Sequence, residues 1–82
     1  MDTRYYTAIE SIGMTVTNYE IGSDDVEIIE AETDTAFGKL SIICGSNGTA
    51  VISKPNGTVK WLYNKSSAQI RAIIKKTLTF YK

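Results

Sequence analysis

The chain has 82 residues and no net charge, and 43% of its residues are hydrophobic and 22% charged. These values are typical of one folded domain and exclude an intrinsically disordered chain. There is no histidine and one cysteine, Cys44, which excludes histidine-based acid–base catalysis, cysteine–histidine metal sites and an internal disulfide. The composition therefore predicts a small non-enzymatic domain without a metal or another cofactor.

The sequence carries no signal for a membrane or for secretion. The longest uncharged segment, 40–53, is interrupted by Gly45 and Gly48, so we expect no membrane span. The first residues, MDTRYYTAIESIG, lack the basic region and apolar stretch of a secretory signal. Because a single cysteine between apolar residues also fits a reducing compartment, we expect a cytoplasmic protein.

Hydrophobic spacing predicts one α+β domain over 1–82, in which an antiparallel meander of four to five strands lies between two helices. The expected elements are a helix at 3–12, strands at 15–21, 25–33, 37–44, 49–54 and 58–63, and an amphipathic helix beginning after Ser66 or Ser67. We expect the closing helix to pack on one face of the sheet. For the acidic stretch 25–33 a helix is the alternative, and as a strand it should contain a bulge at Ile28-Ile29, where two apolar residues break the alternation.

A repeated tripeptide, Asn-Gly-Thr at 47–49 and 56–58, separates the last three predicted strands. It matches the pattern of a glycosylation acceptor, but without a secretory signal we interpret it as turn chemistry. Asn-Gly readily adopts the positive φ angles of tight turns, and a β-branched Thr favours the start of a strand. The two copies therefore predict successive hairpins.

The closing helix is predicted to have an apolar side and a basic edge. Its apolar arc consists of Ile70, Ile73, Ile74, Leu78 and Tyr81. Arg71, Lys75 and Lys82 follow one edge of that arc at four- and seven-residue steps. We expect the arc to cover the sheet while the basic side chains remain in water.

Charge is divided unequally along the chain. Residues 1–38 hold all nine acids and one base, for a net charge of −8, whereas residues 39–82 hold eight bases and no acid, for +8. Two arrangements remain open: cross-strand pairing can mix the two signs, or the fold can keep an acidic pole apart from a basic pole. A separated arrangement would steer a charged partner.

The preferred functional hypothesis is a binding module that docks on a larger protein through its acidic segment, as an inhibitor or adaptor. The predicted docking residues are Glu20, Asp24, Asp25, Glu27, Glu30, Glu32 and Asp34, with Tyr5 or Tyr19 as aromatic anchors. These acids lack the spacing of an EF-hand loop, so we interpret them as a solvated strand face. A viral or mobile-element protein that blocks a nucleic-acid-binding host factor could use such a face to imitate phosphates.

Two alternatives stay open. The first is nucleic-acid binding by Lys60, Trp61, Lys65, Arg71, Lys75 and Lys82, because bases neutralise phosphates and aromatic rings stack on nucleobases. The order of helix, antiparallel strands and helix resembles double-stranded-RNA-binding domains, but 66–70 read SSAQI, without a base. Against this alternative, Trp61 and Tyr63 are expected to belong to the core. The second alternative is a homodimer or larger homo-oligomer that pairs through an edge strand.

Overall fold

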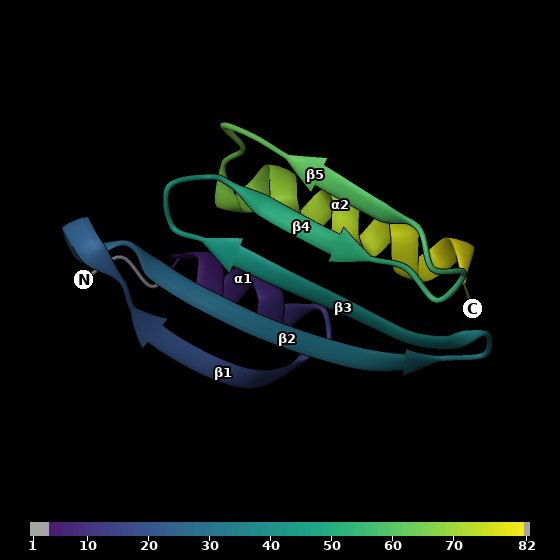
Figure 1. The fold of residues 1–82 in the computed structure, drawn as a ribbon. Helices are drawn as coiled ribbons and strands as arrows, with labels where there is room; N and C mark the ends of the chain where they lie inside the picture. Colours follow the sequence, from purple (N-terminus) through teal and green to yellow (C-terminus); the bar gives the residue numbers. More distant parts are fainter. Residues whose placement is uncertain (1–3, 82) are drawn as a thin grey trace.

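The computed structural model describes residues 4–81 (Figure 1). The elements are α1 (Arg4–Ser11), β1 (Thr15–Ile21), a 3-10 turn (Ser23–Asp25), β2 (Glu27–Thr35), β3 (Gly38–Gly45), β4 (Ala50–Ser53), β5 (Val59–Leu62) and α2 (Ser67–Phe80). The strands form one antiparallel sheet in the order β1-β2-β3-β4-β5, which is also their order in the chain. The predicted α+β architecture is confirmed, and the acidic stretch forms a strand.

Both helices lie on one side of the sheet, behind it in Figure 1. The core lies between the two layers and consists of alternate residues of the strands and the residues on one side of each helix. Its most deeply buried apolar side chains are Ile9, Ile29, Leu40, Ile42, Cys44, Ile52, Ile70 and Ile74. The predicted apolar arc of α2 is confirmed, because Ile70, Ile74 and Tyr81 are buried while Ile73 and Leu78 are partly buried. None of the helices within 4–81 is long and apolar enough to cross a bilayer.

The local signals for turns and helix ends are confirmed. Gly48 and Gly57 adopt φ angles of +91° and +88°, which glycine tolerates without a steric cost. In each turn the asparagine Oδ1 accepts a hydrogen bond from the amide of the threonine two residues later. At the start of α2, Ser66 and Gln69 form a reciprocal capping box that satisfies free backbone amides.

The predicted bulge at Ile28-Ile29 is wrong. The pairing of β2 with β3 is regular there, with Ile28 opposite Gly45 and Ile29 opposite Cys44. Ile29 enters the core and Ile28 points to the other face, so the two neighbouring isoleucines obey the normal alternation of a strand. The irregularity lies instead in β1, between Val16 and Asn18.

Candidate functional site

The sheet face opposite the helices is left uncovered by the described residues. Its side chains change from polar and acidic at one edge to apolar at the other. One row of paired residues crosses all five strands in the order Asn18, Glu30, Ile43, Val51 and Trp61. The row is polar and acidic on β1 and β2 and apolar on β3, β4 and β5. We call this surface the open face.

The apolar half of the open face carries large exposed side chains. The exposed fractions are 46% for Ile43, 52% for Val59, 59% for Trp61 and 62% for Tyr63. The rings of Trp61 and Tyr63 are nearly parallel, with 10° between their planes and 6.4 Å between their centroids. The expectation that these two aromatic residues belong to the core is wrong, because Leu62 between them takes the inward position.

The acidic half of the open face is built by β1 and β2. Ile29 and Ala31 of β2 point into the core, so the alternating residues Glu30, Glu32 and Asp34 point outward. The side chain of Asn18 donates a hydrogen bond of 2.7 Å to Glu30, and Lys39 Nζ lies 3.2 Å from Glu32 Oε1. Glu20 shares this face because it pairs with Ile28, whereas Asp24 and Asp25 occupy the exposed turn after β1.

Glu27 and Tyr5 were predicted to lie on the docking surface, but both are buried. Glu27 is 2% exposed on the core-facing side, where it accepts a hydrogen bond from the Tyr19 hydroxyl. That bond, with desolvation as the second cause, raises the pKa of Tyr19 to about 12. Tyr5 is also buried, at 8% exposed, and its hydroxyl donates to the carbonyl of Lys65, so it offers no exposed anchor.

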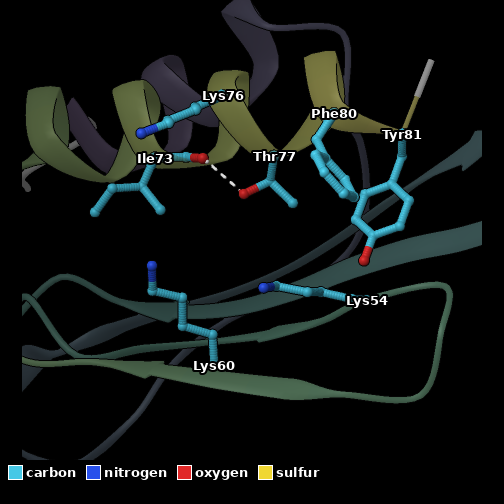
Figure 2. Close-up of a pocket in the computed structure, with 7 residues that line it drawn as sticks. All are labelled: Lys54, Lys60, Ile73, Lys76, Thr77, Phe80 and Tyr81. Atoms are coloured by element: carbon cyan, nitrogen blue, oxygen red, sulfur yellow. Dashed lines mark hydrogen bonds between the residues drawn. The ribbon is translucent and has the colours of Figure 1, made fainter.

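The predicted nucleic-acid-binding residues do not come together on one surface. Trp61 lies on the open face, whereas its neighbour Lys60 points to the helix side and lines a cavity with Lys54 and Lys76 (Figure 2). Arg71 donates to Ser11 Oγ of α1, which is a third location. Lys65 is half-buried in the loop before α2, Lys75 is exposed on α2, and Lys82 lies outside the described residues.

The two charged halves of the sequence are separated in the fold. Because the strands follow chain order, the acids of β1, β2 and their turn occupy one edge of the sheet, and β4, β5 and α2 bring the bases to the other. An ion pair between Lys39 and Glu32 joins the two halves near the middle. Of the two arrangements left open by the sequence, separation describes this molecule.

No group of three or more histidine, cysteine, aspartate or glutamate side chains within 4–81 is placed to hold a metal ion. Cys44 is fully buried, and desolvation raises the pKa of its thiol to about 12, which keeps it in the unreactive protonated form.

Sequence reasoning missed the apolar half of the open face. The available signal was the occurrence of adjacent apolar pairs, Ile42-Ile43 and Val51-Ile52, since one member of each must face away from the core. Comparisons with protein-family models, with curated proteins and with solved structures give no match for this chain.

Proposed function

We propose that this protein is a protein-binding module that docks through the open face of its sheet. One observation carries the proposal: an exposed, stacked aromatic pair, Trp61 and Tyr63, lies on the same uncovered face as a row of carboxylates. Large aromatic side chains are the usual anchors of protein interfaces, and a charged rim steers the encounter. The proposed docking surface therefore combines carboxylates that the sequence predicted with an apolar centre that it did not.

The expected partner is a protein with an apolar patch flanked by lysine or arginine. Four carboxylates of the described residues share the open face, those of Glu20, Glu30, Glu32 and Asp34, whereas Lys39 already pairs with Glu32. This excess of negative charge favours a basic partner and opposes a nucleic-acid backbone. A standard interface of about 800 Å² on each side would use roughly one sixth of the 4976 Å² accessible surface. In this role the protein acts as an inhibitor or an adaptor.

The test compares matched baits in affinity capture from the native cell, followed by binding of the purified partner. We expect Trp61→Ala to weaken binding about thirtyfold or more, as the loss of an interface hot spot does. The double charge reversal Glu30→Lys and Glu32→Lys should slow association, and more so at low salt. Lys75→Ala is the control, because Lys75 is exposed on α2, on the other side of the sheet.

The outcomes separate the alternatives. A captured protein that is lost from both open-face variants and retained by the control supports the proposal. A nuclease-sensitive complex would favour nucleic acid, and self-association abolished by Trp61→Ala would favour a second copy of the chain. A partner that binds wild type and all variants equally would contradict a role for the open face.

A further inference from the structure

A cavity of about 350 Å³ lies between the β4–β5 edge of the sheet and α2, on the side away from Trp61 (Figure 2). Its lining residues are Lys54, Lys60, Ile73, Lys76, Thr77, Phe80 and Tyr81. Its volume falls at the lower end of the range of about 300–1,000 Å³ that small-molecule sites occupy. The cavity is therefore large enough for a small ligand.

Lys60 occupies a position where an apolar residue would complete the core. The inward-facing row across the sheet passes from Ala31 to Ile42 and Ile52, all at most 2% exposed, and ends at Lys60. An apolar side chain there would continue the core beneath α2. Instead, the Lys60 side chain rises from β5 toward the helix and brings a positive charge into the cavity (Figure 2).

Among the described residues, three ammonium groups from three different segments surround this cavity. Lys60 comes from β5, Lys54 follows β4, and Lys76 belongs to α2. Within residues 4–81 none of the three lysine side chains makes a hydrogen bond or an ion pair, and residues 39–82 contain no Asp or Glu. Because like charges around one hollow repel each other, an anion bound among them is favoured.

The rest of the lining is apolar and partly fixed in position. Tyr81 is 7% exposed, and its ring makes edge contacts with Phe37 and Phe80 at centroid distances of 6.1 and 5.0 Å. Ile73 and Phe80 add apolar surface on the helix side. Thr77 donates its hydroxyl proton to the carbonyl of Ile73, so the lysines are the charged donors that face a ligand.

We infer that this cavity binds a small phosphorylated ligand with an apolar group. The phosphate lies among Lys54, Lys60 and Lys76, since lysine ammonium groups bind phosphate as point charges. The apolar group packs against Ile73 and Phe80. The same chemistry occurs in free phosphate esters and in lipid headgroups, so the experiment has an arm for each. This site is on the opposite side of the sheet from the open face and does not depend on the docking proposal.

The experiment titrates the 82-residue chain with phenyl phosphate and follows backbone amide resonances by NMR, with phenol and inorganic phosphate as comparison ligands. We expect phenyl phosphate to bind more tightly than either comparison ligand, because only it supplies both the charge and the ring. The amides of Lys60, Lys76 and Phe80 should shift most. Binding should weaken as salt is added, because the charges are partly exposed.

Two variants test the lysines, and a third is a matched control. Lys60→Gln and Lys76→Gln remove one cavity charge each, and each should weaken binding about tenfold or more, the usual effect of losing a charge-assisted hydrogen bond. Lys75→Gln makes the same change of charge one residue away, outside the cavity lining, and should weaken binding by less than about twofold. Lys76 is exposed on α2, so its variant remains informative if the Lys60 variant folds poorly.

Absence of phenyl phosphate binding would overturn the inference. An equal loss in the Lys75 and Lys76 variants would also overturn it, because it would leave only general attraction to a basic edge. Vesicles of phosphatidylcholine with and without phosphatidic acid identify the source: binding to the acidic vesicles, reversed by Lys60→Gln, assigns a lipid headgroup, and binding of soluble phenyl phosphate alone assigns a free ester. Trp61→Ala should leave phosphate binding unchanged. The proposals for the cavity and for the docking surface are therefore tested independently.

Discussion

The two faces of the sheet are built from the same strands, but both helices pack on one face and the side chains of the other face are exposed. On β3, Ile42 is 1% exposed beneath the helices, whereas its neighbour Ile43 is 46% exposed on the open face. The difference between two identical adjacent residues comes from the alternation of the strand and from the side on which the helices pack. The apolar residues on the open face add little to the core, and we propose that they serve binding.

The two isoleucines of β3 should differ strongly in their contribution to stability. Ile42→Ala should lower the free energy of unfolding by about 2–5 kcal/mol, because it leaves a cavity in a packed core. Ile43→Ala should lower it by less than about 1 kcal/mol, because the side chain is half in water already. Urea denaturation of both variants measures the difference.

The same pair should reverse its order in partner binding. Ile43→Ala removes apolar contact area from the proposed docking surface, whereas Ile42→Ala leaves that surface intact as long as the protein stays folded. If the two alanine variants are destabilised equally, the open face is covered in solution, and the contrast between the faces does not hold.

The two turns that flank β4 should also differ in their tolerance of substitution, because one packs against the rest of the chain and the other does not. At Gly48 an added Cβ would lie 2.8 Å from the carbonyl oxygen and 2.9 Å from the amide nitrogen of Lys65, whereas at Gly57 nothing lies within 4 Å. Gly57→Ala should cost about 1 kcal/mol for its positive φ alone. Gly48→Ala should cost more, about 2 kcal/mol or above, because backbone atoms must also move. Thermal melts of the two variants test this order, and equal melting temperatures would contradict it.

Local signals in the sequence predicted the fold well. The Asn-Gly turns, the serine cap of α2 and the apolar arc from Ile70 to Tyr81 each depend on residues close together in the chain, and each is confirmed. The bulge was misplaced because it follows from the pairing of β1 with β2, and neither strand shows that register alone.

The candidate sites were harder to predict, since they depend on the side chosen by the helices. Trp61-Leu62 and Val51-Ile52 are apolar on both faces, so periodicity does not identify the inward member of either pair. Glu27 was predicted to lie on a solvated strand face with the other acids, yet the register of β2 puts it on the core side. The cavity lysines come from three separate segments, and no spacing links them.

The stability of the protein should also depend on pH, through two residues on the covered face, which is the face of the sheet beneath the helices. Burial raises the pKa of Cys44 from 9.0 to about 12, and the hydrogen bond to Glu27 raises that of Tyr19 from 10.0 to about 12. The folded protein therefore keeps both protons at pH values where the unfolded chain releases them. Their contribution to stability is complete below about pH 9 and is lost as the pH rises toward 12.

Cys44→Ala isolates the cysteine's share of this alkaline loss. Denaturant melts between neutral and strongly alkaline pH should show a shallower fall of stability in the variant than in wild type, whatever the difference between them at neutral pH. In the native protein, thiol labelling near neutral pH should be slow and should accelerate with denaturant. Rapid labelling of the native protein would mean that the covered face opens readily.

The ion pair that joins the acidic and basic halves should contribute little to stability. Lys39 Nζ lies 3.2 Å from Glu32 Oε1, and their side chains are 54% and 38% exposed. Water and salt screen such a pair, so a double-mutant cycle with Lys39→Met and Glu32→Gln should give a coupling energy below about 0.5 kcal/mol. The coupling should shrink further as salt is added. A coupling above about 1 kcal/mol would mean that attraction between the halves helps to hold the sheet together, and the separated charges would then serve folding as well as the proposed binding.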